Sequence, residues 1–263
     1  MPIRHASYDR PMVTRNMLIL AIDTSTLQGA IGWVKLKPNG IAGSVEAFAE
    51  CSAPAKPGHA ETLLHRVAQI LSYGGYEARD VELLVFGKGP GTFTGLRIGL
   101  STVKGLGLAD NIPVIGMSSL EALAFSVNMT GVVAPLIDAR RSELYGALYE
   151  TVMSDGWPRT KRILDEQVGS FEGIIDTLGS PDLPSPIVFT GNGVGPYRRQ
   201  IAERFGSRAI VLPKTHWAPS PFWMARIGYG RFLETGSDDI DTIVPVYLRE
   251  PDARLPDDKL RKL

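Results

Sequence analysis

A glycine-rich segment, GKGPGTFTGLR from Gly87 to Arg97, connects an apolar run to a pattern of helical spacing. Glycine lets the backbone adopt positive φ and approach a ligand closely. The start of the following helix presents unpaired N–H groups and a partial positive charge. The segment predicts either an anion-binding junction or a tight structural turn, and it matches neither the Walker A loop nor GxGxxG. Its candidate binding residues are Gly89, Gly91, Thr92, Thr94 and Gly95.

Two aspartates end apolar runs and begin polar turns, Asp23-Thr24-Ser25 and Asp138-Ala139-Arg140. In actin-like ATPases the equivalent turns hold nucleotide phosphates and magnesium, whereas an aspartate at a strand end is also a common cap. Both interpretations stay open for Asp23, Ser25, Asp138 and Arg140. Ala139 stands where such ATPases have glycine, which argues against close phosphate approach at the second turn.

The histidines and the cysteine do not predict a metal site. His59 and His65 are six residues apart, so on one helix they would point in different directions. His5 and His216 lie in unrelated segments, and Cys51 is the single cysteine, which excludes an intramolecular disulfide and a multi-cysteine zinc site. No Ser-His-Asp or Cys-His pair is evident, although such groups assemble in space.

The composition is that of an ordinary globular protein, with 44% hydrophobic and 21% charged residues. Lys plus Arg and Asp plus Glu both total 28, which excludes a globally basic nucleic-acid binder but not a local basic patch. No apolar run is long enough to span a bilayer, and residues 1–16 lack the apolar region of a signal peptide. We therefore expect a cytoplasmic protein whose structured part begins at Met17. Residues 1–16 are expected to be either a disordered extension or the product of a misassigned start.

The first half of the chain predicts the order βββαβαβα. Aliphatic and alternating runs predict a three-stranded antiparallel meander, and later segments alternate between helical and strand patterns. The predicted strands are 18–22, 30–36, 44–51, 81–86 and 113–117, and the predicted helices 60–71, 94–109 and 118–127. Ser118 or Ser119 is the expected N-cap of the third helix, because Glu121 follows closely.

The second half begins in the same way, and the repetition is one of architecture, without any residue-level repeat. Its predicted strands are 132–137, 144–152, a weaker one at 162–166, and 187–190; its predicted helices are 171–178, 197–205 and 219–234. We predict an α/β protein of two duplicated subdomains, 17–128 and 129–250, around a cleft. A loose charged tail is expected at 251–263.

Five motifs together resemble the TsaB family, also called YeaZ, over residues 17–249. They are IDTS at 22–25, HAETLL at 59–64, GKGPGTFTGLRIG at 87–99, APLIDAR at 134–140 and PVYLR at 245–249. The resemblance implies an actin-like ASKHA fold with two βββαβαβα-type subdomains. It also implies a role in forming N6-threonylcarbamoyladenosine at position 37 of tRNAs that read codons beginning with A.

The resemblance implies partners as well. TsaB pairs with its paralogue TsaD, the catalytic subunit, and the ATPase TsaE joins them. TsaD holds a metal through an HxxxH pair after a PVxG-type strand; here Pro113–Gly116 is such a strand, and Ser119 and Leu123 stand at the histidine positions. Leu has no donor atom and neutral Ser is a poor ligand. We expect a noncatalytic partner subunit that binds and activates a TsaD-like enzyme, contacts tRNA mainly through the complex and requires no cofactor, with weak ATP or ADP binding left open.

The implied pairing surface comprises the two helices at 60–71 and 95–109. Small residues of the second helix, Gly99, Ser101, Gly105 and Gly107, predict close packing against the protein's own sheet, a partner, or both. We also expect the isolated chain to form a homodimer. The interface candidates are His59, Glu61, Thr62, His65, Arg66, Gln69, Arg97, Leu100, Ser101, Lys104 and Leu108.

Other functions remain as alternatives. The main one is an ATP-binding ASKHA enzyme, an ATPase or phosphotransferase, that uses Asp23, Asp138 and the glycine segment on its own. Direct tRNA binding by the isolated chain is disfavoured by the zero net charge. A zinc protease ranks last, because the sequence has no HExxH motif.

Overall fold

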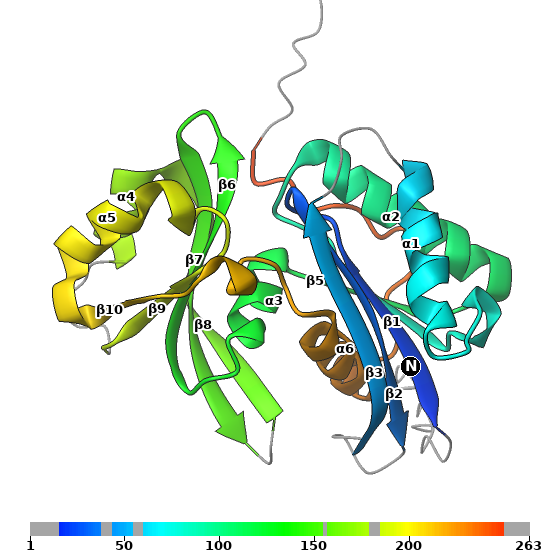
Figure 1. The fold of residues 1–263 in the computed structure, drawn as a ribbon. Coiled ribbons are helices and arrows are strands. Elements are labelled where there is room, and N and C mark those ends of the chain that lie inside the picture. Colours follow the sequence, from blue (N-terminus) through cyan, green and yellow to red (C-terminus); the bar gives the residue numbers. More distant parts are fainter. Residues whose placement is uncertain (1–15, 38–43, 55–59, 155–156, 179–184, 250–263) are drawn as a thin grey trace, which may run out of the picture.

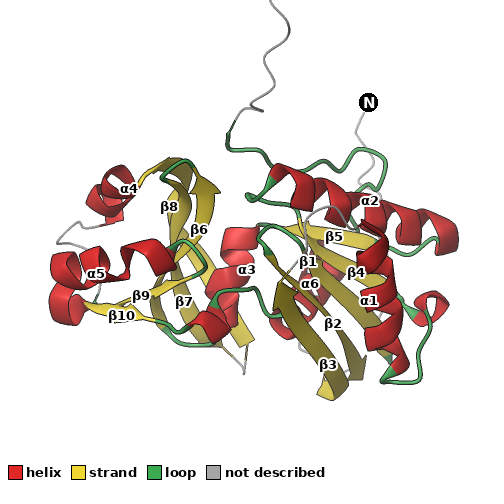
Figure 2. Ribbon diagram, turned by 45° about the horizontal axis from the view of Figure 1, so that its top comes forward, coloured by secondary structure: helices red, strands yellow, loops and turns green. Residues whose placement is uncertain are grey.

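Two sheets lie side by side, with helices on their outer faces and between them (Figures 1 and 2). The computed structural model describes residues 16–37, 44–54, 60–154, 157–178 and 185–249. The first strand begins at Met17. Residues 1–15 of the extension expected at 1–16 and the tail expected at 251–263 lie outside the described residues.

The first sheet has the strand order β3-β2-β1-β4-β5. β1, β2 and β3 pair antiparallel, which confirms the predicted meander, and β4 and β5 continue the sheet parallel to β1. Every residue of β1 and of β4 is buried, as their aliphatic composition requires. The strands are β1 (Met17–Asp23), β2 (Gln28–Lys37), β3 (Ser44–Pro54), β4 (Leu83–Gly87) and β5 (Val114–Met117).

The second sheet has the order β10-β9-β6-β7-β8, which read from β8 repeats the topology of the first. Its strands are β6 (Gly131–Arg140), β7 (Glu143–Ser154), β8 (Trp157–Ser170), β9 (Ile187–Thr190) and β10 (Ala209–Val211). β8 is much longer than the weak strand predicted at 162–166. β10 was not predicted, because it has only three residues and none of them is fully buried.

In the described part of the chain, six α-helices complete the two halves, and each half reads βββαβαβα. They are α1 (Ala60–Ser72), α2 (Phe93–Asp110), α3 (Ser119–Ser126), α4 (Phe171–Leu178), α5 (Val194–Phe205) and α6 (Pro221–Thr235). Ser118 is the N-cap of α3, and its hydroxyl accepts a hydrogen bond from the Glu121 N–H at 3.3 Å. The repeated order and sheet topology confirm the actin-like ASKHA fold.

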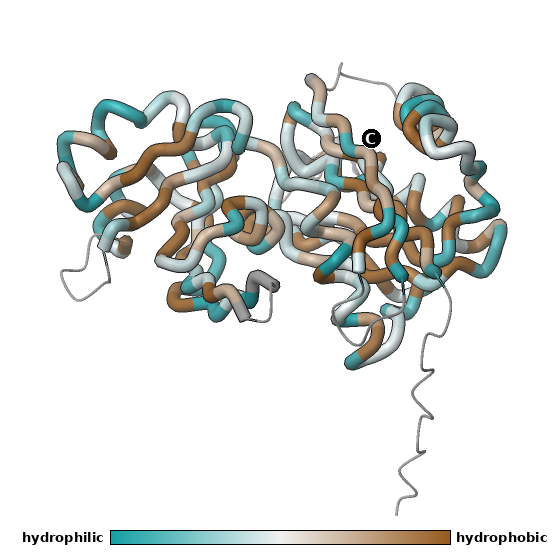
Figure 3. Tube along the Cα trace, turned by 60° about the horizontal axis from the view of Figure 1, so that its bottom comes forward, coloured by the Kyte–Doolittle hydropathy of each residue, from teal (hydrophilic) through white to brown (hydrophobic). Residues whose placement is uncertain are grey.

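Each sheet is covered by helices on both faces, and hydrophobic residues follow the strands of both sheets (Figure 3). On the first sheet, α1 and α2 pack on one face with Leu20 and Phe86, and α6 packs on the other with Ile19 and Val85. On the second sheet, α4 and α5 cover one face and α3 covers the other. The helix that ends each half therefore packs on the sheet of the opposite half. A division of the chain between residues 128 and 129 places each sheet in its own subdomain. α3 and α6 nevertheless each pack on the sheet of the other subdomain.

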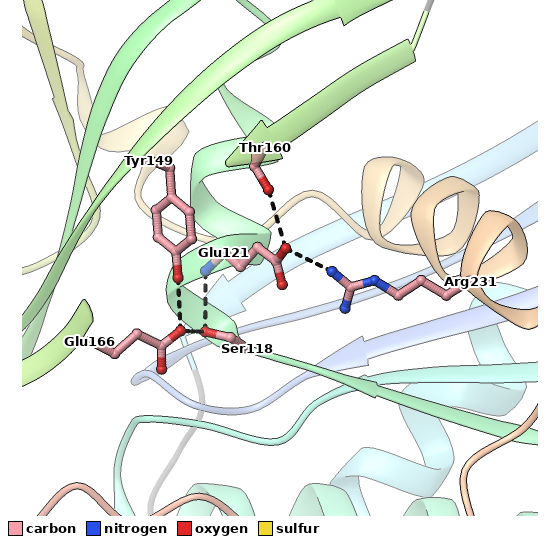
Figure 4. A network of polar contacts seen from close by, with 6 residues as sticks. All are labelled: Ser118, Glu121, Tyr149, Thr160, Glu166 and Arg231. Atoms are coloured by element: carbon pink, nitrogen blue, oxygen red, sulfur yellow. Dashed lines mark hydrogen bonds and ion pairs between the residues drawn. The ribbon is translucent and has the colours of Figure 1, made fainter. Parts of the chain in front are cut away.

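A polar network joins α3 and α6 to the second sheet (Figure 4). Glu121 of α3 forms an ion pair with Arg231 of α6 at 2.7 Å and accepts a hydrogen bond from Thr160 of β8. Glu166 of β8 accepts hydrogen bonds from the Ser118 hydroxyl and from the Tyr149 hydroxyl, the latter at 2.7 Å. Burial and the neighbouring Glu166 carboxylate raise the pKa of Tyr149, so this hydroxyl stays a donor. The network ties the two subdomains together.

Candidate functional site

Asp23, at the end of β1, is a fully buried carboxylate. Its Oδ1 accepts hydrogen bonds from the Ser25 N–H at 2.9 Å and the Ser25 hydroxyl at 2.6 Å, and its Oδ2 accepts one from the Ser119 hydroxyl at 2.9 Å. Burial raises the pKa of Asp23, and these three hydrogen bonds oppose the rise. The predicted residue Ser25 therefore binds Asp23 directly.

The glycine segment packs against this same turn. The Thr92 N–H donates to the Ser25 carbonyl oxygen at 2.7 Å, and the Thr24 hydroxyl donates to the Gly95 carbonyl oxygen at 2.7 Å. A Cβ on Gly91 would fall within 3.0 Å of the Ser25 backbone, and a Cβ on Gly95 would fall as close to the Thr24 carbonyl oxygen. At Gly91 and Gly95, the lack of a side chain lets the protein's own backbone at Ser25 and Thr24 lie close to the glycine segment. Thr94, by contrast, is exposed at the start of α2.

A segment after α6, residues 238–249, covers the other side of the glycine loop; we call it the C-terminal strap. The Val246 N–H donates to the Lys88 carbonyl oxygen at 2.7 Å, and the Ser119 N–H donates to the Gly89 carbonyl oxygen at 2.8 Å. Gly89 has a φ of +114°, and a Cβ there would lie 2.6 Å from the Val246 carbonyl oxygen. Gly89 is thus enclosed by α3 and the strap, and its conformation requires glycine.

The Asp138–Arg140 turn, the second turn predicted as a binding site, makes different contacts from the Asp23–Ser25 turn. The half-buried Asp138 accepts a hydrogen bond from the Arg140 N–H at 2.8 Å, and the Asp138 N–H donates to the Asn192 side chain at 3.1 Å. The Arg140 guanidinium lies 3.8 Å from the Asp138 carboxylate. Asp138 and Arg140 are therefore held together within the second subdomain, whereas Asp23 and Ser25 belong to the first.

The two positions that the resemblance assigns to metal-binding histidines are inside the protein. Ser119 is fully buried with its hydroxyl bonded to Asp23, and Leu123 is fully buried in the core between α3 and the second sheet. Within the described ranges, no group of three or more His, Cys, Asp or Glu side chains could hold a metal ion. Over the same residues, no helix has the length and apolar character needed to cross a membrane.

The interface candidates of α1 and α2 differ in exposure. The exposed ones are Thr62, His65, Gln69, Arg97, Ser101 and Leu108, with Leu108 57% exposed. Arg66, Leu100 and Lys104 are half-buried, and Lys104 donates to the Asp241 carbonyl oxygen of the strap at 3.1 Å. His59 and the side chain of Glu61 lie outside the described residues.

Sequence reasoning missed three exposed hydrophobic residues near these helices. Leu64 of α1 is 50% exposed, Phe93 of α2 is 38% exposed and Tyr247 of the strap is 37% exposed. The adjacent residues Leu63 and Leu64 could have indicated an exposed leucine, because a helix can bury only one of them on a single narrow face. Tyr247 gave no local signal, since its neighbour Phe93 is far away in the sequence.

Comparisons with known proteins agree with this architecture. Residues 53–220 match the family model described as TsaD, tRNA N6-adenosine threonylcarbamoyltransferase. The chain is 28% identical to the tRNA threonylcarbamoyladenosine biosynthesis protein TsaB of Bacillus subtilis, over 90% of this chain and 96% of that protein. It is 32% identical to TsaB of Buchnera aphidicola subsp. Schizaphis graminum, over 74% of this chain and 88% of that protein.

A solved structure gives the same assignment. YeaZ from Pseudomonas aeruginosa superimposes with a TM-score of 0.68 at 26% identity, covering 88% of this chain and all of that one. Shared fold, sequence identity along most of the chain and the matching family model lead to one conclusion. The chain belongs to the TsaB (YeaZ) family of tRNA threonylcarbamoyladenosine biosynthesis proteins.

Proposed function

We propose that this chain is a noncatalytic partner subunit in tRNA N6-threonylcarbamoyladenosine formation, and that it binds and activates a TsaD-like catalytic subunit. The proposal rests on the burial and the contacts of Ser119 and Leu123, which stand at the positions expected for metal-binding histidines. Leu123 offers no ligand atom, and the Ser119 hydroxyl is buried in a hydrogen bond to Asp23. A metal-dependent transfer would have to take place on another polypeptide, for which this chain supplies a binding surface.

The surface that we propose for this partner is the exposed side of α1 and α2. The two helices lie next to each other on one face of the first sheet (Figure 2) and share a hydrophobic cluster beneath them. Leu64 and Leu108 remain half-exposed on them, although burying a leucine stabilises by about 1.5–3 kcal/mol. A Cβ on the exposed Gly105 would meet nothing within 4 Å, so a second helix can approach α2 closely there. Exposed apolar side chains next to small residues are typical of a surface that binds another protein.

Co-expression with the TsaD-like protein of the same genome tests this proposal. The pair should co-purify, and Leu108→Asp should weaken their association at least tenfold in a titration. Met129→Asp is the matched control, because Met129 is 45% exposed but precedes β6 in the second subdomain. Failure of the wild-type pair to associate at several salt concentrations would overturn the proposal, as would equal effects of the two substitutions.

Several finer points belong to the same proposal. The isolated chain should form a homodimer through the same face, so Leu108→Asp should also shift its sedimentation toward monomer. A TsaE-like ATPase would join through the complex, and the chain would need no cofactor of its own.

The competing function, an ATPase or phosphotransferase, predicts ATP turnover by the isolated chain that Asp138→Ala abolishes. We expect none above background, because the backbone of the Asp23–Ser25 turn occupies the space beside Gly91 and Gly95.

A further inference from the structure

By its packing, the molecule consists of two units that differ from its two sequence halves. The first unit is the first sheet with α1, α2 and α6, and the second unit is the second sheet with α3, α4 and α5. Within the described residues, the chain passes from one unit to the other at three places. Two of them are the passage from Met117 of β5 into α3 and the passage into α6 at Ser220. The third lies between Tyr247, whose ring contacts Phe93 of α2, and Leu248, which packs on the core between α3 and the second sheet.

The first two crossings lie at the two ends of α3. Ser118, the N-cap of α3, directly follows Met117 of β5. At the other end, the hydroxyl of Ser126, the last residue of α3, accepts a hydrogen bond from the Ser220 N–H at 2.7 Å. The eight residues of this helix rise by about 12 Å. Two points fix a line but not the rotation about it, so these two crossings alone would let the units rotate about α3.

The polar contacts between α3 and the first unit begin on this same line. The Ser119 hydroxyl donates to Asp23 at 2.9 Å, and Glu121 forms its ion pair with Arg231 at 2.7 Å. Groups on an axis move little when two bodies rotate about that axis. These contacts therefore hold the units together at α3 but oppose the rotation only weakly.

The C-terminal strap crosses away from α3. Its red end lies beside β6 in Figure 1, well above α3. There the Arg249 guanidinium donates to the Ala139 carbonyl oxygen at 2.9 Å and lies 3.3 Å from the Glu143 carboxylate, so it binds both ends of the β6–β7 turn. Leu248 adds its apolar contact with the second unit. A third contact away from the axis opposes rotation, because it acts at a distance from the hinge.

The strap is attached unequally to the two units. On the first unit it is bound along its length, from the Gly116 N–H, which donates to the Asp238 carboxylate at 2.7 Å, to the Val246 N–H, which donates to the Lys88 carbonyl oxygen at 2.7 Å. The second unit is bound through residues 248–249. Loss of these few contacts would free the second unit while the strap stays in place on the first.

We propose that the strap is a latch: Leu248 and Arg249 hold the two units closed, and their release lets the units rotate apart about α3. This structure shows the closed state. In the open state, the glycine segment and the β6–β7 turn, which the strap now connects, move away from each other. Hinge motions of this kind are absorbed by a few residues at the ends of elements, as at Met117 and Ser220. The inference goes beyond the partner-subunit function and does not depend on it.

The test measures the distance between the two units in the complete isolated chain. Cys51, the single cysteine, is exposed on β3 of the first sheet, and Arg198→Cys adds a second exposed site on α5. Nitroxide labels at both sites are measured by double electron–electron resonance. Labelled protein is diluted into unlabelled protein, so that the distances come from within one chain. Arg249→Gln should add a longer distance whose share is at least fivefold larger than in the protein with native Arg249. Leu248→Ala should add the same distance without changing any charge.

The matched control is Arg204→Gln. It also removes one arginine, but it breaks the exposed ion pair with Asp176 at 2.8 Å, which lies within the second unit. It should leave the distance distribution unchanged, and circular dichroism with thermal melting verifies that all variants fold. An unchanged distribution in both latch variants would overturn the proposal, even if their melting temperatures fall, because the strap would then be a fixed brace. The same longer distance in Arg204→Gln would also overturn it.

Discussion

At the scale of single residues, the informative group is Asp23. A carboxylate fully removed from water favours its protonated form, and the three hydrogen bonds from Ser25 and Ser119 offset only part of this cost. The same hydroxyl of Ser119 stands where the catalytic paralogue is expected to carry a metal ligand. In this chain, the residue connects α3 to the end of β1 and holds the glycine segment in place through its N–H.

Asp23→Asn should change the pH dependence of stability. Because the pKa of Asp23 is raised above its ordinary value of 3.8, its favourable contribution is complete below pH 3.8 and is lost as the pH rises through the folded-state value. Asn stays neutral, so the variant should gain stability relative to the wild type between pH 4 and pH 7.5. Each unit of pKa shift corresponds to about 1.4 kcal/mol. Urea denaturation at both pH values measures the difference, and a relative loss by the variant over this range would contradict the assignment.

At the scale of elements, the glycine segment serves as a contact between α2 and the β1–β2 turn. Gly91 and Gly95 let the loop and the first turn of α2 lie directly on Thr24 and Ser25. The strap packs along another side of α2, where Ile240 lies against Gly107. α2 is thereby fixed on the first sheet, and its exposed side keeps a defined position.

Gly95→Ala and Gly105→Ala should have opposite effects on stability. Both positions lie in α2, but a Cβ on Gly95 would overlap the Thr24 carbonyl oxygen, whereas one on Gly105 would meet nothing within 4 Å. Gly95→Ala should cost about 1–3 kcal/mol through overpacking. Gly105→Ala should stabilise by about 0.5–1 kcal/mol, because alanine is the better helix former. Urea denaturation of the two variants checks this, and a neutral Gly95→Ala would show that α2 is not seated on the turn.

At the scale of the whole molecule, the two subdomains exchange their last helices. α3 packs on the second sheet and α6 on the first, and the Glu121–Arg231 ion pair joins the two helices at 2.7 Å. The strap adds a second connection through Arg249 and Ala139. Neither sheet is completely covered without the other half of the chain, so the two subdomains should unfold together.

Glu121→Gln should therefore destabilise both sheets equally. It leaves Arg231 partly buried without its carboxylate, at a cost of about 1–3 kcal/mol. Hydrogen exchange followed by mass spectrometry should show the same drop in opening free energy for β1 and for β6. Glu203→Gln is the control, because it breaks the exposed Arg199–Glu203 pair on α5 and should cost less than about 0.5 kcal/mol. A drop confined to one sheet would mean that the subdomains open independently.

The sequence by itself determined the elements, because their hydrophobic periodicity and their caps are local. The order βββαβαβα of the first half, an N-cap at Ser118 or Ser119, and the replacement of both expected metal-binding histidines at Ser119 and Leu123 could all be predicted. The three-residue β10 could not, because it is too short and too exposed to show a pattern.

Only the tertiary structure decided which distant residues meet. Thr24 binds Gly95 across 71 positions, Ser119 binds Asp23 across 96, and Arg249 reaches Ala139 across 110. These contacts distinguish a packed turn from an open anion site at the glycine segment, and they join the strap to the second subdomain. The physical reason is that helix and strand periods are properties of neighbouring residues, whereas the exchange of α3 and α6 and the course of the strap depend on how two complete sheets pack.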